Sequence, residues 1–256
     1  MAKATSKQVK PKEGKWLTVV YSPVSLFSLK RSDATSMAAR TNLVPTPYAI
    51  KMALLKVMLE NQGNDQSTNF DTWIKQEFAW IRDLEIRVLP PQCLVVNRNG
   101  YKLRYYDQTA DKADKTRSTM PLTDGFVFRE WVHLADHLKF CCGVIESLPE
   151  TLCERTTKLK MLFSQINYFS KRGCFFQYLP NEVQETEQPP PDFHLNTNAS
   201  FTIQPMDDVG EKATFGRINP YSDEKVRLDS DRIIKPGLLP LQLTATSARY
   251  DLYQRR

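Results

Sequence analysis

The clearest pattern of apolar and polar positions lies between residues 46 and 60 and predicts a helix. Thr46 can accept a hydrogen bond from the free amides of a first helical turn, and the proline that follows has a φ angle already suited to a helix. From residue 50 to residue 59 nearly every position is apolar, which leaves polar side chains on one narrow side only. We therefore expect a core helix covered on more than one face, with Tyr48 and Lys51 near its exposed edge.

Further apolar patterns predict two more helices and a series of strands. Apolar and aromatic residues recur at helical spacing after Phe70 and again after Pro149, whereas the other apolar runs are short and rich in β-branched and aromatic residues. The aromatic stripe of the helix after Phe70 is more typical of a core face than of a surface that stacks on bases. The expected helices cover residues 70–81 and 149–166, and the expected strands cover residues 16–21, 85–89, 93–98, 101–106, 126–134, 138–145 and 174–179.

Two hairpins are expected among these strands. Asn99-Gly100 lies between two alternating segments and is a strong signal for a tight turn, because both residues tolerate positive φ angles. A second hairpin is expected across residues 135–137, between the strands that flank them. The stretch 107–124 is polar and cannot contribute to a core, so it is expected to be either a disordered insertion or a functional finger that projects from the sheet.

The order of elements through residue 179 predicts an α+β fold. A strand, a helix, two hairpins, a helix and a strand form a βαββαβ core with insertions, which is the ferredoxin-like arrangement. Residues 182–192 are acidic and proline-rich, as linkers often are, and strands are expected at 199–204 and 238–246. The expected organisation is a flexible basic tail at 1–14, a ferredoxin-like domain at 15–180 with a projecting thumb at 101–125, and a linker with a small C-terminal β appendage at 181–256.

The composition is that of a soluble globular protein with an excess of basic residues. Apolar residues make up 41% and charged residues 25% of the 256 residues, and the formal net charge is +6. A basic balance favours a polyanionic partner such as nucleic acid, although extra lysines also aid solubility. No apolar run approaches the roughly 20 residues needed to span a bilayer, and residues 1–14 lack the apolar segment of a secretory signal, so we expect a cytoplasmic protein.

The sequence offers little support for metal, cofactor or nucleophile chemistry. The five cysteines show no C-x-x-C spacing and are expected to be reduced thiols, and the Walker A, G-x-G-x-x-G and G-x-S-x-G motifs are absent from the sequence. His133 and His137 are four residues apart, as in a two-histidine metal site, but they bracket an expected strand turn. Asp207-Asp208 has no partner cluster in the sequence. We expect no catalytic residue, no metal and no cofactor.

What remains is a set of cations and aromatic residues on expected loops and helix starts. Single-stranded RNA needs positive charge for its phosphates and side chains that stack or wedge against unstacked bases. Two prolines hold the segment before the first helix extended, and the free amides of a helix start also bind phosphates. The candidate RNA-binding residues are Lys30, Arg31, Arg40, Tyr48, Lys51, Arg104, Lys112, Lys115, Arg117, Met120, Lys171 and Arg172.

Several of these segments resemble the RAMP superfamily of CRISPR-associated proteins, specifically the handle-capping backbone subunit of type I Cascade, the fifth Cas protein. The resemblance rests on the strand at 16–21, followed by Arg40 and by the proline-led helix opening at 45–55. It rests also on the segment 128–132 (FREWV) and on the helix that ends at Ser-Lys-Arg-Gly, residues 170–173.

The resemblance covers residues 15–180 and implies a ferredoxin-like palm with a protruding β-hairpin thumb at 107–124. Arg40, Tyr48 and Lys51 would then lie close to the 5′ handle of a guide RNA. The implied partners are that guide RNA, backbone RAMP subunits and the large subunit of a CRISPR effector, with target DNA contacted indirectly. The resemblance implies neither a membrane nor a small-molecule substrate.

Two other functions remain open at this point. Some members of the resembled family cut precursor RNA with a tyrosine and a Lys-His pair. The chain contains no Lys-His dipeptide, and the glycine-rich loop usual in processing RAMP enzymes is also missing, so we expect no cleavage. A metal-independent endoribonuclease that processes precursor guide RNA is nevertheless kept as one alternative. The other is a generic basic protein-interaction domain whose cationic loops serve solubility.

Overall fold

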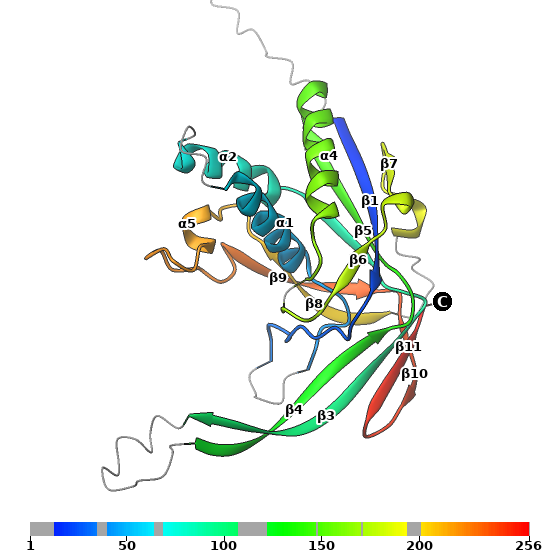
Figure 1. The fold of residues 1–256 in the computed structure, drawn as a ribbon. Coiled ribbons are helices and arrows are strands. Elements are labelled where there is room, and N and C mark those ends of the chain that lie inside the picture. Colours follow the sequence, from blue (N-terminus) through cyan, green and yellow to red (C-terminus); the bar gives the residue numbers. More distant parts are fainter. Residues whose placement is uncertain are drawn as a thin grey trace, which may run out of the picture.

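The structure is a computed structural model, and it describes residues 13–34, 40–63, 69–106, 122–146, 148–169, 171–193 and 201–255. These residues form three antiparallel sheets with helices packed beside them (Figure 1). The expectation of a mixed α and β fold is confirmed.

The central sheet consists of β1 (Glu13–Pro23), β2 (Glu85–Leu89), β5 (Leu138–Glu146), β6 (Phe176–Tyr178) and β7 (Gln184–Thr186). The strands run in the order β2-β5-β1-β6, and β7 also pairs with β1. Every pair is antiparallel. Segments far apart in the chain therefore meet in this sheet.

Three helices lie beside this sheet: α1 (Pro47–Gln62), α2 (Phe70–Arg82) and α4 (Pro149–Ser164). Helix α4 packs against β1 and β5, and α1 packs against both other helices. Tyr21 of β1 lies in the core, where its ring contacts Phe140 and Phe169 and its hydroxyl donates to the carbonyl oxygen of Phe163 at 2.6 Å. No helix in the described ranges is long and apolar enough to cross a membrane.

Helix α1 begins where the sequence predicts. Thr46 Oγ1 accepts a hydrogen bond from the Ala49 amide at 3.3 Å, and the helix ends before Gly63, whose φ of 56° favours glycine. Buried residues follow one another around the helix, so it is covered on more than one face as expected. One of them is Lys51, with only 1% of its surface exposed, and the expectation that Lys51 lies near the exposed edge is wrong.

The second sheet consists of β10 (Gln242–Thr246), β11 (Tyr250–Gln254), β3 (Cys93–Tyr106) and β4 (Leu122–Leu134), in that order. Strands β3 and β4 extend from the body as a long curved ribbon (Figure 1). This β3–β4 ribbon contains the flanks of the predicted thumb, whereas residues 107–121 of the predicted finger lie outside the described residues.

The expected hairpin at Asn99-Gly100 is wrong, because β3 runs straight through both residues. Gly100 pairs with Phe128 of β4, in a register that continues from Leu94 to Tyr106. The glycine is needed there for a different reason: a Cβ atom would lie 2.7 Å from Cζ of the Phe126 ring. Pairing with a distant strand has therefore overridden the local preference for a turn.

The expected hairpin across residues 135–137 is also wrong. Strand β4 pairs with β3, whereas β5 pairs with β1 and β2, so the two strands on either side of this turn belong to different sheets. The turn is a corner, fixed by a hydrogen bond of 3.0 Å from the Ala135 amide to the Cys93 carbonyl oxygen. Each strand has a longer-range partner that a sequence pattern does not reveal.

The C-terminal residues form a third sheet and also complete the second. Strand β8 (Thr202–Val209) pairs with β9 (Arg232–Leu239) and packs on α1, while β11 pairs with β3. The single strand expected at 238–246 is wrong, because the chain breaks between β9 and β10 at Pro240-Leu241. The division at residue 180 stays a prediction. The remaining short elements are α5 (Phe215–Ile218), η1 (Pro180–Glu182) and η2 (Pro191–Phe193).

Candidate nucleic-acid interface

Three of the predicted cations lie on a short backbone ladder that precedes α1. The Asn42 amide donates to the Leu29 carbonyl oxygen at 2.7 Å, and the Arg31 amide donates to the Arg40 carbonyl oxygen at 3.0 Å. Lys30 forms a bridge with Thr41 between these two bonds. We call this pairing of residues 29–31 with residues 40–42 the entry ladder. It brings Lys30, Arg31 and Arg40 together although eight residues lie between the last two in the sequence.

The entry ladder is attached to the base of the β3–β4 ribbon. Phe27 and Val132 of β4 exchange backbone hydrogen bonds of 2.9 and 2.7 Å. The Thr41 amide donates to Glu130 Oε2 at 2.9 Å, and Ser28 Oγ donates to the Glu130 carbonyl oxygen at 3.0 Å. The cations of the ladder are therefore held by fixed backbone at the point where the ribbon leaves the body.

A polar groove of about 290 Å³ runs between the entry ladder and β11, lined by Arg31, Arg40 and Arg98 among others. Arg98 is committed to the fold, since its guanidinium pairs with Asp251 and lies 3.3 Å from Glu130. Arg40 is exposed, and its charge acts with that of Arg98 to lower the pKa of Tyr253, although burial raises that pKa overall. Arg40 is thus the freer of these two charges.

Arg31 already has a carboxylate partner at the surface. Its Nε and Nη2 atoms donate to the two oxygens of Asp33 at 3.0 and 2.7 Å. These hydrogen bonds, opposed by burial and helped by the charge of Arg31, lower the pKa of Asp33. Because half of the Asp33 side chain is exposed, a phosphate oxygen can compete with it for the guanidinium.

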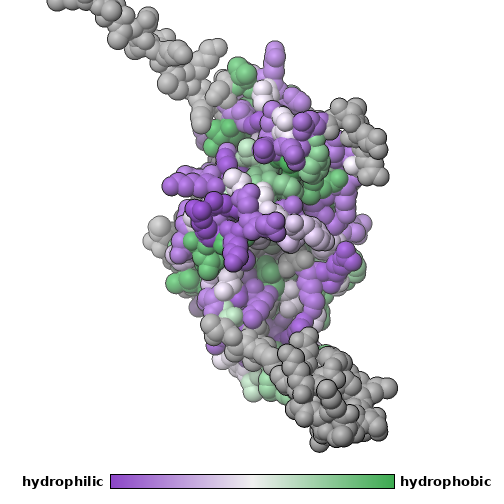
Figure 2. All heavy atoms as spheres, turned by 90° about the vertical axis from the view of Figure 1, so that its left-hand side faces the viewer, coloured by the Kyte–Doolittle hydropathy of each residue, from purple (hydrophilic) through white to green (hydrophobic). Residues whose placement is uncertain are grey.

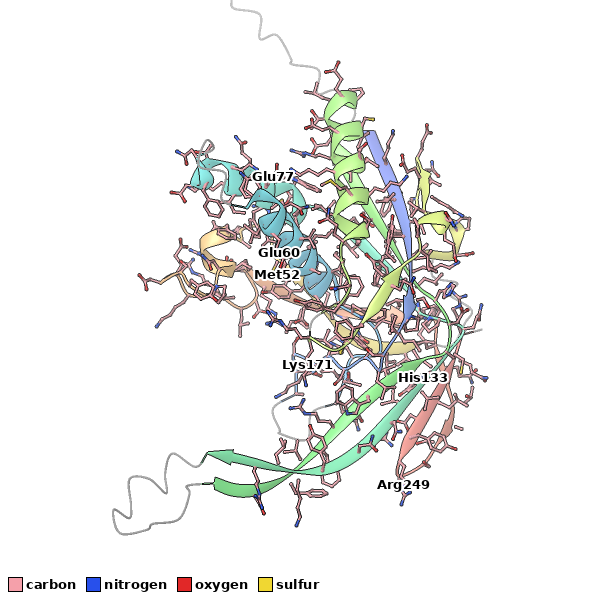
Figure 3. The ribbon with its side chains drawn as sticks, in the orientation of Figure 1. Met52, Glu60, Glu77, His133, Lys171 and Arg249 are labelled. Carbon is pink, nitrogen blue, oxygen red and sulfur yellow. The ribbon has the colours of Figure 1, made fainter. Side chains whose placement is uncertain are left out.

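Lys171 (Figure 3) lies on the exposed turn that follows α4, and Arg172 is the next residue of that turn. The Lys171 ammonium lies 5.6 Å from the centre of the Trp131 ring on β4, a cation–π contact. A hydrogen bond from Ser25 Oγ to the Gly173 carbonyl oxygen, at 2.7 Å, also ties this turn to the segment that follows β1. This second cationic segment therefore borders the same strand as the entry ladder.

The described part of the ribbon carries an aromatic pair that sequence reasoning missed. Phe126 and Phe128 are 57% and 55% exposed, and their rings meet edge to face with centroids 4.9 Å apart. The space beside them is left by Gly100 on β3. The signal was present in the sequence as alternate phenylalanines on one strand face. Arg104 lies further along the ribbon, exposed and 3.2 Å from Asp124.

Four predicted site residues cannot be placed in this arrangement. Lys112, Lys115, Arg117 and Met120 lie outside the described residues.

On the face shown in Figure 2, hydrophilic residues predominate and surround smaller hydrophobic areas.

Lys51 does not belong to this surface. Its ammonium donates to the Arg82 carbonyl oxygen at 2.7 Å and pairs with Asp208 Oδ1 at 2.7 Å. The side chain joins α1 to the end of α2 and to β8, with its three-donor head directed at these groups rather than at solvent. The prediction that Lys51 lies close to the RNA is corrected here, because the side chain is buried.

Tyr48 lies in a separate pocket of about 330 Å³, which we call the Tyr48 pocket. The guanidinium of Arg232 stacks 4.6 Å from the centre of the Tyr48 ring. Burial raises the pKa of Tyr48, even though the charge of Arg232 lowers it, so the hydroxyl remains protonated at neutral pH. The pocket is lined by Leu29, Lys30, Ser32, Asn42, Thr46, Tyr48, Ala49, Met52, Ala53, Lys56, Val57, Gln165, Ile166, Asn167, Tyr168, Asp207 and Arg232.

The two adjacent aspartates of β8 have partners that the sequence could not indicate. Asp207 Oδ2 accepts hydrogen bonds from Ser32 Oγ and from Arg232, whose Nε atom lies 3.0 Å away, and Asp208 pairs with Lys51. Successive strand residues point to opposite sides, which explains the two different partners.

His133 and His137 lie at the turn between β4 and β5. His133 is exposed on β4, and His137 Nδ1 lies 3.5 Å from Glu182 Oε1. Among the described ranges, no group of three or more histidine, cysteine or acidic residues is arranged to hold a metal ion.

Comparison with known proteins gives one significant sequence relative. No protein-family model matches the chain. A curated protein named CRISPR-associated protein Cas5, from Archaeoglobus fulgidus, is 23% identical over 223 residues, which cover 83% of this chain and 87% of that protein.

A solved structure described as a crystal structure of a CRISPR protein from Archaeoglobus fulgidus covers 94% of this chain and 92% of that chain, with 10% identity and a TM-score of 0.39. The resemblance read from the sequence motifs agrees with the name of the sequence relative. Over most of its length, this chain is therefore similar to a protein named CRISPR-associated protein Cas5.

Proposed function

We propose that this protein is a non-catalytic, guide-RNA-binding subunit of a type I CRISPR surveillance complex (Cascade), in which it caps the 5′ handle of the guide. The observation that carries the proposal is the entry ladder, which fixes Lys30, Arg31 and Arg40 at the base of the β3–β4 ribbon. The name of the sequence relative supports membership of a CRISPR effector.

The arrangement suits a single strand that passes between the body and the ribbon. Cations neutralise the phosphates of a nucleic acid, and the backbone bond of the entry ladder holds Arg31 and Arg40 next to each other for this purpose. Lys171, whose ammonium lies beside Trp131 of β4, and the exposed Arg172 next to it in the sequence add further positive charge. Together these residues would contact the phosphates of the RNA strand from the entry ladder and from the turn after α4.

The ribbon supplies what the cations lack, which is a surface for bases. The exposed rings of Phe126 and Phe128 lie on a strand whose base is bordered by the ladder. Aromatic faces of this kind accept unstacked bases with little dependence on sequence. The ribbon would therefore act as the thumb of the protein and lie beside a neighbouring backbone subunit.

The strand order of the central sheet supports a ferredoxin-like palm behind this thumb. The order β2-β5-β1-β6, with α1 following β1 and α4 following β5, is that of a βαββαβ unit in which the ribbon and α2 are insertions. The remaining partners of the proposal are the large subunit and, indirectly, target DNA, in the cytoplasm.

The proposal excludes RNA cleavage by this subunit. The chain has no Lys-His dipeptide. Burial raises the pKa of the Tyr48 hydroxyl. A tyrosine acting on RNA needs a base to take its proton, and a raised pKa opposes that step. Incubating the protein with labelled repeat RNA in chelator tests this point, since discrete products would contradict it.

Handle recognition is tested by filter binding with two RNAs of equal length. One carries the repeat-derived handle followed by spacer, and the other carries spacer sequence alone. We expect at least about tenfold tighter binding of the handle RNA at physiological salt, because ordered contacts add to the phosphate term. Equal affinity for both RNAs would contradict handle capping and would favour a generic basic surface.

A further inference from the structure

The carboxylate of Glu130 on β4 joins the entry ladder to the base of the β3–β4 ribbon. Its Oε2 atom accepts a hydrogen bond from the Thr41 amide at 2.9 Å, and its Oε1 atom accepts one from Arg98 Nε at 3.3 Å. Only 15% of the Glu130 side chain is exposed. Hydrogen bonds to an ionised group are stronger than those between neutral groups, so a carboxylate bonded at both oxygens holds Thr41 in place relative to β3.

A second side chain holds the same segment closer to α1. Gln204 of β8 accepts hydrogen bonds from the amides of Leu43 and Val44 at 2.7 and 3.3 Å, and it donates to the Val44 carbonyl oxygen at 3.1 Å. Loss of the Glu130 carboxylate therefore leaves the end next to the helix anchored. It frees the backbone amide that directly follows Arg40.

Glu130 also lies on the same side of the ribbon as the exposed aromatic pair. The pairing of β4 with β3 is continuous along β4, and successive strand residues point to opposite sides, so Phe126, Phe128 and Glu130 share one side. Positions two residues apart in a strand are separated by about 7 Å. The attachment of the ladder at Glu130 thus sets its distance from the surface proposed for bases.

We propose that Glu130 is a positioning residue for the bound RNA. Its carboxylate holds the ladder, and Arg40 in particular, at the spacing from Phe126 and Phe128 that a single RNA strand occupies. Glu130 itself does not contact the phosphates, because like charges repel. The proposal rests on the RNA-binding function proposed above and gives a role in it to an acidic residue among the cations.

The charge of Glu130 and its hydrogen bond to Thr41 have opposite effects on RNA binding. Hydrogen bonds to Asp33 raise the pKa of Arg31, and the charge of Glu130 adds to this effect, so Glu130 acts electrostatically on the ladder. A residue that acted by charge alone would weaken the binding of a polyanion, and any neutral replacement would strengthen it. Positioning predicts that two neutral replacements differ, because glutamine keeps an oxygen that can accept the Thr41 amide, whereas alanine does not.

The test measures filter binding of the handle RNA over a series of salt concentrations for the wild type, Glu130→Gln and Glu130→Ala. We expect E130A to bind about fivefold more weakly at low salt, and the magnitude of its slope of log K against log salt to fall by about 0.7 to 1.4, which corresponds to one or two phosphate contacts. E130Q should bind at least as tightly as the wild type. The matched control is Asp251→Ala, which removes the other carboxylate that pairs with Arg98, leaves the Thr41 bond intact and should not weaken binding.

Hydrogen exchange followed by NMR measures the hold on the ladder directly. The Thr41 amide should exchange slowly in the free wild type and in E130Q, and rapidly in folded E130A. The amides of Leu43 and Val44, which are bound to Gln204, should stay protected in all three proteins. Should E130A fail to fold, Glu130→Leu takes its place, because leucine fills the space and accepts no hydrogen bond.

Each outcome supports or overturns the positioning role. Weaker binding by the alanine or leucine variant, with binding kept in E130Q and D251A, supports it. Unchanged or tighter binding by that variant, or equal weakening in E130Q or D251A, overturns it and leaves handle binding standing. Rapid exchange of the Thr41 amide in the wild type overturns it without any variant. Failure of the wild type to bind the handle RNA rejects the proposed function and the positioning role together.

Discussion

Replacing Lys51 by methionine separates the contribution of this residue to folding from any contribution to RNA binding. Methionine keeps most of the apolar stem and removes the ammonium. Among the described residues, Asp208 Oδ1 then keeps the hydrogen bond from the Val209 amide, at 2.7 Å, and the Arg82 carbonyl oxygen loses the Lys51 donor. We expect the variant to fold less stably and to bind RNA as the wild type does.

The size of the effect follows from the burial of the pair. Removing one partner of a fully buried ion pair costs about 3–5 kcal/mol, because the other charge is left without compensation. The Asp208 side chain is 30% exposed, so water recovers part of this loss. We therefore expect the free energy of unfolding to fall by about 2–4 kcal/mol, which corresponds to a Tm lower by roughly 10 °C for a chain of this size.

Urea and thermal unfolding followed by circular dichroism measure this change. The control is Lys56→Met on the same helix, which removes an exposed pair with Glu60 at 2.8 Å and a cation–π contact with Tyr168 and should cost less than about 1.5 kcal/mol. RNA affinity is measured well below the Tm of both variants and should stay within about twofold of the wild type for Lys51→Met. Unchanged stability together with weakened RNA binding would refute the assignment of Lys51 to the interior.

Three further outcomes are expected. Asp33→Ala frees the guanidinium of Arg31 and should strengthen RNA binding by about two- to fivefold at low salt, and unchanged affinity would separate Arg31 from the RNA path. In timed alkylation at pH 8, followed by mass spectrometry, the exposed Cys153 should react first, because burial raises the pKa of the Cys141 and Cys142 thiols. Prompt labelling of Cys141 and Cys142 would contradict their burial. Gly100→Val places atoms where a phenylalanine ring of β4 now lies, 2.7 Å from the added Cβ, and should lower the free energy of unfolding by about 1–3 kcal/mol in urea titrations; an unchanged midpoint would mean that the ring moves aside freely.

Local signals predicted the helices well. The Thr46 cap, the proline after it and the periodicity that starts at Phe70 depend only on neighbouring residues, and α1 and α2 begin where these signals lie. The strand at 85–89 also agrees, because it is bounded by polar and proline residues. In each case the physical cause acts over a few residues and is visible in the sequence.

The predictions that depended on pairing were less successful. Asn99-Gly100 has the chemistry of a turn, yet thirty residues away β4 offers a continuous partner that keeps β3 extended. The corner at 135–137 looks like a hairpin because a change of sheet leaves no mark in a hydrophobic pattern. Both errors arise from strand partners that local propensity does not specify.

The same limit applied to the candidate site. The sequence identified Arg31 and Arg40 as cations, but their juxtaposition depends on backbone bonds across an intervening loop. The sequence shows no partner for Asp207. In the structure, Arg232 of β9 and Ser32, which is 175 residues earlier in the chain, both donate hydrogen bonds to its carboxylate. Lys51 was misplaced because a lysine on an apolar helix is usually exposed, and its half-buried partner Asp208 lies far away in the sequence, on β8.

The salt dependence of handle-RNA binding tests the role of the entry ladder most directly. The affinity is measured over a series of salt concentrations for the wild type and for a variant in which Lys30, Arg31 and Arg40 are all replaced by glutamine. Each phosphate contact to a single strand contributes about −0.7 to the slope of log K against log salt, so losing three contacts should reduce the magnitude of the slope by about 2 and weaken binding at low salt. An unchanged slope in a correctly folded variant would contradict the account, because it would place the RNA away from the base of the ribbon.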